Sequence, residues 1–316
     1  MNQKDREILE NKIIEARHLN IDSNMSPFKI VYNNKAYYVR TNKIKEVLYE
    51  KLASNLAKKV GINCPECEVL VTKNNLYALI EDINNYGSFK EMKKLINKDD
   101  KTYGEDETLS NLWYFLEQNN LEYLMEEILK IYMFDILLMN FDRHSSNFGI
   151  LADMNNNSKA YIFDNEYILN PELAPKITAV STFENDDQRY NFNLSSNNKN
   201  FLIDFSLKKL TSNKIEEMMS EEEYERELFE EYLKDVKTDF VEFMEVSTSE
   251  HINLIKEIYD KITPKIIEEE IANIENVYGI KLKSRSVLKQ QQRLYKLIGH
   301  ILENTIIKEK SSSLTM

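Results

Sequence analysis

Cysteine and histidine are scarce in this chain of 316 residues, which holds two cysteines and four histidines. Cys64 and Cys67 form a C-x-x-C pair, an arrangement found in redox sites and as half of a zinc site. A zinc site needs a second pair of ligands, and no two histidines stand at ligand spacing; they are His18, His144, His251 and His300. We therefore interpret the two cysteines as reduced thiols in a loop.

Positive charge is also in short supply. The chain has 53 acidic and 41 basic residues, a net charge of -12. Broad affinity for nucleic acid or anionic membranes needs a basic face, so neither is an expected partner. No apolar run approaches the roughly 20 residues of a membrane-spanning helix, and residues 1–18 are charged and amphipathic, unlike a signal sequence. We expect a cytoplasmic protein; secretion as an effector and the oligomeric state stay open.

The length and the globular composition, with 42% apolar and 30% charged residues, predict two lobes. The N-terminal lobe is expected at 1–83, as a small antiparallel sheet with one helix after an N-terminal helix. Apolar spacing and turn residues predict these elements in order: a helix at 5–18, strands at 28–32 and 35–40 around Asn33-Asn34, a helix at 46–60 stopped by Gly61, and strands at 68–71 and 76–80.

The remainder reads as a connector and a larger helical lobe. Residues 84–108 are polar and predict a connector with a short helix near 89–96. Residues 109–316 predict a mainly helical lobe, with a buried helix at 121–139, a strand hairpin at 148–151 and 160–163, an extended surface loop at 178–200, and helices at 202–210, 215–239, 240–246, 251–259 and 265–306. The acidic run at 216–223 is interpreted as a solvated helix face, not a metal cluster.

The stretch NFDRHSSN at 140–147 carries the strongest chemical signal. Asp142 follows the buried helix, Asn147 precedes the first hairpin strand, and Asp164 follows the second. Antiparallel pairing would bring Asn147 and Asp164 to the same end of the hairpin, beside Asp142. Phosphoryl transfer from ATP needs such a set: one carboxylate to orient the attacking hydroxyl, and an amide and a carboxylate to hold magnesium.

An isolated Asp in the position of Asp142 is more often a turn or helix-cap residue than a catalytic one. An isolated Asn in the position of Asn147 is more often a turn residue than a metal ligand. Their spacing, an Asp followed five residues later by an Asn, equals that of the protein-kinase catalytic loop, and it favours a nucleotide-phosphate site. Arg143 could keep Asp142 ionised and correctly turned. His144 could position the loop through a backbone hydrogen bond.

The run N-x-D-R-H-x-x-N-x-G at 140–149, followed by a strand hairpin and Phe163-Asp164-Asn165, resembles the C-terminal catalytic region of HipA-like kinases. These are bacterial Ser/Thr kinases of a divergent protein-kinase fold, distantly similar to lipid kinases. A weaker resemblance extends to the strand at 37–40 and the helix at 50–62. The resemblance implies an α+β, bilobal protein-kinase-like fold with a small antiparallel-sheet N-lobe and a mainly helical C-lobe.

The same resemblance implies roles for individual residues. Asp142 would be the catalytic base, with Arg143 beside it, and Asn147 and Asp164 would bind Mg²⁺. The ATP site would take in Arg40, Glu50, His144 and the hinge backbone of Glu81 and Ile83. Arg40 stands where the family carries a phosphate-binding lysine, and Lys43 or Lys45 are the alternatives.

The chain departs from the family pattern in three places. No glycine-rich loop covers the phosphates, and Asn33-Asn34 is the nearest turn. Glu166 stands where glycine is common, and it could ligate a second magnesium or face solvent. The chain has no room for the extra N-terminal domain of the toxin kinases, so we expect a shorter, stand-alone type and assume neither a toxin role nor an antitoxin partner.

The expected function is that of an ATP- and Mg²⁺-dependent kinase that transfers the γ-phosphoryl group to Ser or Thr of a protein whose identity the sequence does not reveal. A lipid or small-molecule kinase is one alternative, since the same loop chemistry serves any hydroxyl acceptor. A catalytically inactive, pseudokinase-like binding module is the other. Arg40 and the missing glycines motivate that alternative.

Overall fold

The structure is a computed structural model, and it describes residues 3–19, 27–40, 44–72, 76–96, 109–140, 143, 146–155, 157–169, 192–194, 199–201, 247–282 and 285–313, with most of 229–244. The chain forms two compact units, each assembled from three segments. The first unit contains residues 1–95, 145–168 and 265–283, and the second contains 96–144, 169–264 and 284–316. Each lobe expected from the sequence, at 1–83 and 109–316, is one continuous segment. In the structure, segments of the two units alternate along the chain.

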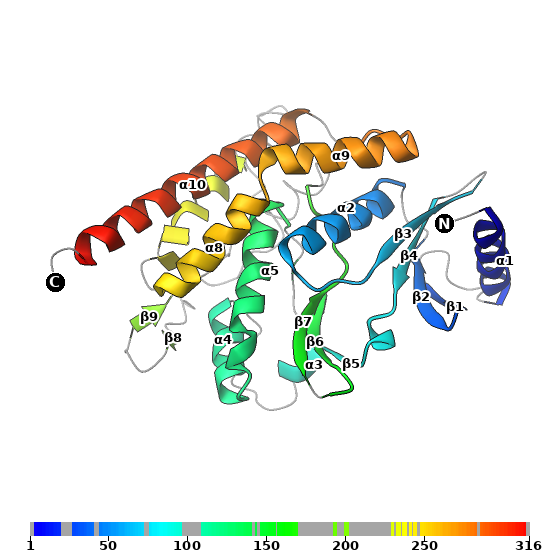
Figure 1. Cartoon of the computed structure of the whole chain (residues 1–316), viewed down its shortest axis with the longest axis horizontal. Helices are drawn as coiled ribbons and strands as arrows, with labels where there is room; N and C mark the ends of the chain where they lie inside the picture. Colours follow the sequence, from blue (N-terminus) through cyan, green and yellow to red (C-terminus); the bar gives the residue numbers. More distant parts are fainter. Residues whose placement is uncertain are drawn as a thin grey trace, which may run out of the picture. The chain divides into compact units, whose positions relative to one another are not determined.

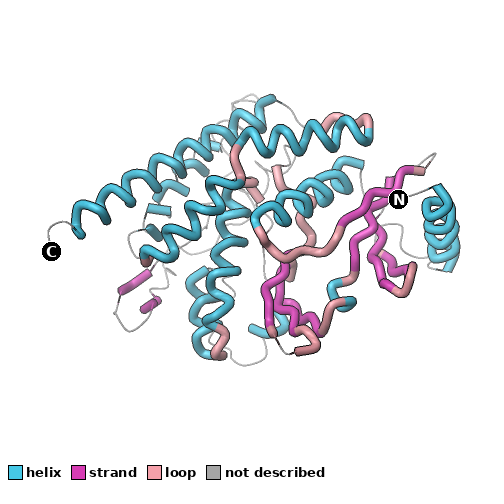
Figure 2. The backbone as a smooth tube through the Cα atoms, in the orientation of Figure 1, coloured by secondary structure: helices cyan, strands magenta, loops and turns pink. Residues whose placement is uncertain are grey.

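A four-stranded antiparallel sheet forms the start of the first unit, with strand order β1-β2-β4-β3 (Figure 2). Its strands are β1 (Phe28–Tyr32), β2 (Lys35–Arg40), β3 (Cys67–Val71) and β4 (Leu76–Glu81). Asn33 and Asn34, at φ 48° and 61°, form the β1–β2 turn. Two left-handed residues in a two-residue loop match the right-handed twist of paired strands, so the predicted hairpin is confirmed.

Two helices accompany this sheet (Figure 1). Side chains of α1 (Gln3–Leu19) join a core cluster with one face of the sheet: Leu9, Ile13, Ile30, Val39, Leu70, Tyr77 and Leu79. Helix α2 (Ile44–Val60) packs on β3 and β4. All six residues of β4 are buried, which requires both faces to be covered. Arg40 is paired with Ala78 of β4. Because successive side chains of a strand point to opposite faces, Arg40 lies on the face opposite its neighbour Val39.

A second sheet in this unit has the order β5-β6-β7, with β5 (Ser88–Glu91), β6 (Phe148–Ala152) and β7 (Ser158–Ile162). The hairpin predicted at 148–163 is confirmed as β6–β7. The helix predicted near 89–96 is wrong in its first half, because residues 88–91 form a strand and α3 (Met92–Ile96) begins only at Met92. Pairing with β6, about 60 residues away in sequence, overrides the local pattern. A short 3₁₀ helix, η1 (Ile83–Asn85), links the two sheets.

Helix α9 (Pro264–Tyr278) joins the first unit from Lys265 onward. Glu270 on α9 binds two residues of α2. It accepts a hydrogen bond from Asn55 Nδ2 at 2.7 Å and forms an ion pair with Lys59 Nζ at 3.0 Å. The buried Tyr49 hydroxyl donates to the carbonyl oxygen of Leu282 at 2.8 Å. A segment more than 200 residues downstream therefore secures α2.

The described part of the second unit is mainly helical. It contains α4 (Leu109–Gln118), η2 (Glu122–Leu124), α5 (Met125–Leu137), α8 (Ser249–Lys261), α10 (Arg285–Ser313) and the strand pair β8 (Phe192–Leu194) and β9 (Lys199–Phe201). Helix α5 packs against α8 and α10. The core of the second unit is rich in aromatic side chains, among them Trp113, Phe134, Phe240 and Phe243.

Several expectations for this unit need correction. The helix expected at 121–139 starts with η2, and the α-helix begins at Met125. The helix expected at 265–306 is interrupted, because Gly279 adopts φ 69° after α9 and α10 starts at Arg285. The loop expected at 178–200 contains β8 and the start of β9. Its remainder, the helix expected at 202–210 and the acidic run at 216–223 lie outside the described residues.

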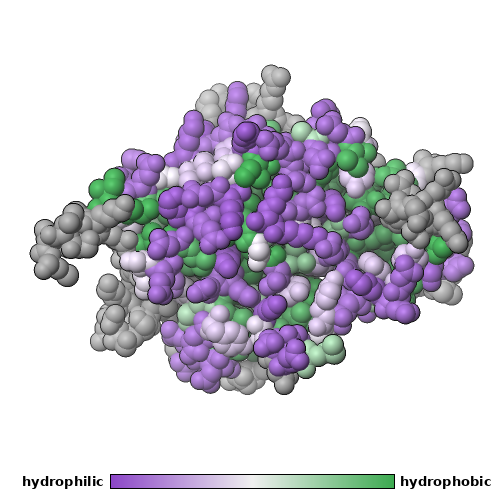
Figure 3. Space-filling model, in the orientation of Figure 1, coloured by the Kyte–Doolittle hydropathy of each residue, from purple (hydrophilic) through white to green (hydrophobic). Residues whose placement is uncertain are grey.

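Hydrophilic side chains cover most of the face drawn in Figure 3, with smaller hydrophobic areas between them. None of the helices in the described ranges is long and apolar enough to cross a membrane.

Candidate functional site

Arg40, the last residue of β2, lies between two carboxylates that come from the segment after β7. Its Nη1 atom lies 2.6 Å from Asp164 Oδ1 and also bonds Glu166 Oε2. Only 16% of the Arg40 side chain is exposed. Burial alone would lower the pKa of Arg40, but the hydrogen bond and charge of Asp164, together with Glu166, outweigh it and raise that pKa. The guanidinium therefore stays charged at any physiological pH.

Glu50 on α2 is buried and binds the same segment at its backbone. Its carboxylate accepts a hydrogen bond from the backbone N–H of Asn165, with an N–O distance of 2.6 Å. Burial raises the pKa of Glu50 to about 7, an effect opposed by the charge of Arg40 and reinforced by that of Asp164. Glu50 thus anchors the residue that directly follows Asp164.

Asp164 has a backbone conformation that is uncommon among non-glycine residues, although Asp adopts it more readily than most. Its φ is 58°, in the left-handed region, which costs a non-glycine residue about 1 kcal/mol or slightly more. Hydrogen bonds hold the residues on either side: Phe163 N–H donates to Asn147 O at 3.1 Å, and Asn165 N–H donates to Glu50. Backbone strain that neighbouring contacts maintain in this way is found mainly at functional sites.

The predicted juxtaposition of Asn147 and Asp164 is present. The β6–β7 register pairs Phe148 with Ile162, and the hydrogen bond from Phe163 to Asn147 extends this pairing by one step. Asn147 therefore lies opposite Phe163, and Asp164 is the next residue at the same end of the hairpin. Asn147 is buried, whereas the Asp164 side chain is 32% exposed.

The donor set at this hairpin end fits a hard divalent cation such as Mg²⁺. Amide and carboxylate oxygens are the ligands that Mg²⁺ prefers, and three carboxylates, Glu50, Asp164 and Glu166, surround one guanidinium. Within the described ranges no group of three or more His, Cys, Asp or Glu is arranged to hold a metal. A Mg²⁺ ion held by Asn147 and Asp164 would need further oxygen ligands from water or a nucleotide, as is usual for this ion.

Glu166 does not face solvent. It is 5% exposed and binds Arg40, which excludes the solvent-facing alternative, while the other alternative, a ligand of a second magnesium, stays a prediction. Burial raises the pKa of Glu166, opposed by Arg40 and reinforced by Asp164. Lys45, an alternative to Arg40, is exposed on α2. Lys43, the other alternative, lies outside the described residues, as do Asp142 and His144.

Arg143 is bound to α5 by a carboxylate that sequence reasoning missed. Its Nε and Nη2 atoms donate to the two oxygens of Asp135 at 2.8 Å and 3.0 Å, and Asn140 Nδ2 donates to Asp135 Oδ1 at 2.7 Å. This buried, two-pronged pair fixes the start of the 140–147 loop to α5. The available signal was a single carboxylate inside the apolar run of residues 128–139.

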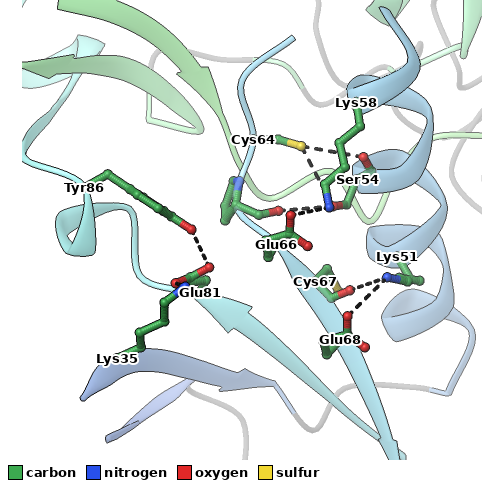
Figure 4. A network of polar contacts seen from close by, with 11 residues as sticks. Lys35, Lys51, Ser54, Lys58, Cys64, Glu66, Cys67, Glu68, Glu81 and Tyr86 are labelled. Carbon is green, nitrogen blue, oxygen red and sulfur yellow. Dashed lines mark hydrogen bonds and ion pairs between the residues drawn. The ribbon is translucent and has the colours of Figure 1, made fainter. Parts of the chain in front are cut away.

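The predicted hinge, residues 78–83, extends from the end of β4 to the first residue of η1. The backbone N–H of Glu81 donates to Glu66 O at 2.8 Å, and its carboxylate binds Lys35 at 2.6 Å and the Tyr86 hydroxyl (Figure 4). Ile83 begins η1, where its carbonyl accepts from Tyr86 N–H. We assign adenine binding to the Glu81 carbonyl oxygen and the Ile83 N–H, and this assignment stays a prediction.

Cys64 and Cys67 are both free thiols, as expected. Cys64 Sγ lies near Ser54, 3.7 Å from its carbonyl oxygen, and burial raises the pKa of Cys64 to about 11 (Figure 4). Cys67 is not in a loop, since it begins β3, where its carbonyl accepts from Lys51 Nζ at 2.7 Å. Thiols with raised pKa values are poor nucleophiles, so this pair is not a reactive site.

Comparison with known protein families identifies the family of the chain. Residues 27–241, more than half of the chain, match the HipA-like C-terminal domain. The chain belongs to the HipA-like kinase family. It is 26% identical over 197 residues to the serine/threonine-protein kinase CtkA of Helicobacter pylori. That alignment covers 54% of this chain and 59% of the relative, less than two thirds of its length.

Solved structures support the same fold. The crystal structure of the Helicobacter pylori proinflammatory kinase CtkA matches with a TM-score of 0.55 at 17% identity, covering 91% of this chain and 98% of that one. HipA of Shewanella oneidensis, solved with HipB and operator DNA, matches at a TM-score of 0.43, 12% identity and coverages of 93% and 70%, too distant to support an argument. The predicted α+β class is confirmed, with antiparallel sheets in the N-terminal part and helices in the C-terminal part.

Proposed function

We propose that this HipA-like protein is an ATP- and Mg²⁺-dependent kinase that transfers the γ-phosphoryl group to Ser or Thr of a protein. The observation that carries the proposal is the convergence of Arg40 on Asp164 at the hairpin end where Asn147 also lies. A cation for phosphate oxygens and two oxygen donors for a metal thereby meet within one compact unit. This combination is what nucleotide-phosphate binding requires.

The residues would divide the work as follows. Asn147 and Asp164 would hold Mg²⁺, which neutralises phosphate charge when bound. Arg40 would exchange its contact with Asp164 for phosphate oxygens, with a planar fork suited to that geometry. Asp142 would orient the acceptor hydroxyl and take up its proton. Arg143, fixed by Asp135, would hold the loop that carries Asp142, and the Glu81 carbonyl and Ile83 N–H would bind adenine.

The acceptor is the least constrained part of the proposal. CtkA is named a serine/threonine-protein kinase, and the chain aligns with 59% of that protein. A lipid or small-molecule acceptor would use the same loop chemistry. The inactive binding module is disfavoured by the arrangement of Arg40, which is charged, largely buried and paired with Asp164.

Mass spectrometry after incubation with ATP and Mg²⁺ tests the proposal. We expect phosphorylated Ser or Thr in the protein or an added protein substrate, and at least about a hundredfold loss of transfer in Asp142→Ala and Asp164→Asn. Asp153→Asn is the matched control, because Asp153 lies at the opposite end of the same hairpin and orders its turn. Transfer that persists in both site variants contradicts the proposal, and a thermal shift with ATP but no transfer favours a binding module.

A further inference from the structure

The two carboxylates that bind Arg40 differ in exposure. The Asp164 side chain is 32% exposed, and that of Glu166 only 7%. Asp164 is thus accessible to a metal ion, while Glu166 is almost completely buried beside the guanidinium. A buried carboxylate retained beside a buried cation is costly unless the two remain paired. The pairing between Glu166 and Arg40 is therefore the more permanent of the two.

Glu50 has a different partner. In protein kinases the phosphate-binding lysine must pair with a glutamate of the helix that follows its strand. Here Glu50 occupies that helix, but its carboxylate accepts from the Asn165 backbone at 2.6 Å and from Asn165 Nδ2 at 3.5 Å. It holds the turn after Asp164. Of the two glutamates, Glu166 is the one in hydrogen-bonding contact with the strand cation.

We propose that Glu166 is a positioning residue that holds Arg40 toward the nucleotide phosphates and so replaces the helix glutamate in this task. The inference rests on the proposed kinase function. When Asp164 is committed to Mg²⁺, Arg40 loses one of its two partners, and Glu166 keeps the guanidinium from turning away. Glu50 does not hold Arg40 and instead accepts a hydrogen bond from the backbone N–H of Asn165.

Calorimetric titration with ATP measures the effect directly. In the presence of Mg²⁺ we expect Glu166→Gln to bind ATP about tenfold more weakly, the equivalent of one charge-assisted hydrogen bond. In EDTA the loss should be smaller, since Asp164 still anchors Arg40. In steady-state assays KM for ATP should rise more than kcat falls. Glu68→Gln is the control, because it removes a carboxylate that is 56% exposed on β3 of the same unit.

A double-mutant cycle assigns the effect to Arg40. In an Arg40→Gln background, Glu166→Gln should change ATP affinity by less than about twofold. Glu166→Asp, which keeps the charge but shortens the side chain, should recover part of the affinity, and thermal unfolding reports whether each variant is folded. Unchanged or tighter ATP binding by folded Glu166→Gln, or an equal loss without Arg40, overturns the inference. If the unaltered protein binds no ATP, the proposed function fails as well.

Discussion

At the scale of single residues, the site is a group of largely buried charges in which two carboxylates share the Arg40 guanidinium and a third binds the backbone. Glu166 binds the Arg40 guanidinium, Glu50 binds the Asn165 backbone, and Asp164 is the partly exposed member. One guanidinium among three carboxylates leaves excess negative charge in a low-dielectric environment. Burial, reinforced by the charge of Asp164, raises the pKa values of Glu50 and Glu166, and the excess negative charge would favour a divalent cation at Asp164.

The stability of the protein should depend on pH through Glu50. Its pKa is about 7 in the folded chain against an ordinary value of 4.5, so between these values the folded chain holds a proton that the unfolded chain has released. Stability from this group is therefore complete below about pH 4.5 and is lost as pH rises to about 7, by about 3 kcal/mol at most.

Urea unfolding of the wild type and Glu50→Gln from pH 5 to 8 tests this, since the amide keeps an acceptor for Asn165 but does not titrate. The free energy of unfolding of the variant, relative to wild type, should increase across this range. Parallel pH curves for the two proteins would show that Glu50 titrates normally.

At the scale of elements, the hairpin β6–β7 places the proposed metal ligands Asn147 and Asp164, and β5 pairs with this hairpin. Gly149, the glycine of the N-x-D-R-H-x-x-N-x-G run, lies directly against β5, where an added Cβ would stand 2.2 Å from Lys90 O and 2.7 Å from Phe89 Cζ. The glycine of the motif therefore serves strand pairing. Close approach of backbones is a common reason for a glycine inside a strand.

Gly149→Ala should destabilise the protein by about 2–3 kcal/mol, because the neighbouring backbone of β5 must move. Gly61→Ala is the matched control. Gly61 has φ 74° and no atom within 4 Å of an added Cβ, so its substitution adds backbone strain of about 1 kcal/mol only. Urea denaturation compares the two, and equal losses would mean that β5 yields easily.

At the scale of the whole molecule, the first unit is completed by residues distant in sequence. Helix α9 contributes Glu270, which binds Asn55 and Lys59 on α2, the helix that also carries Glu50. The position of Glu50 thus depends on a segment that sequence order alone assigned to the helical lobe.

Loss of this contact should be measurable in the free energy of unfolding. Glu270→Ala should cost about 1–3 kcal/mol, because it leaves Asn55 and Lys59 without a largely buried carboxylate. The neighbouring Glu269 is exposed and pairs only with Lys265 at 3.7 Å, so Glu269→Ala should change stability by less than about 0.5 kcal/mol. Similar values for the two variants would show that α9 contributes little through Glu270.

The sequence by itself determined the local elements and named the candidate residues of the site. Both hairpins and α2 were predictable because turn residues, strand alternation and helical spacing act over a few residues. The order of Asp142, Asn147 and Asp164 was equally readable, since one hairpin brings Asn147 and Asp164 together.

Tertiary structure decided which partner each charge has. β5 forms as a strand because β6 pairs with it, and Arg143 is held by Asp135, eight residues earlier on a buried helix. Glu166 binds Arg40 from 126 residues away, and Glu50 binds the Asn165 backbone from 115 residues away. Such pairings depend on burial and distance in the folded chain, which the local pattern of a sequence does not encode.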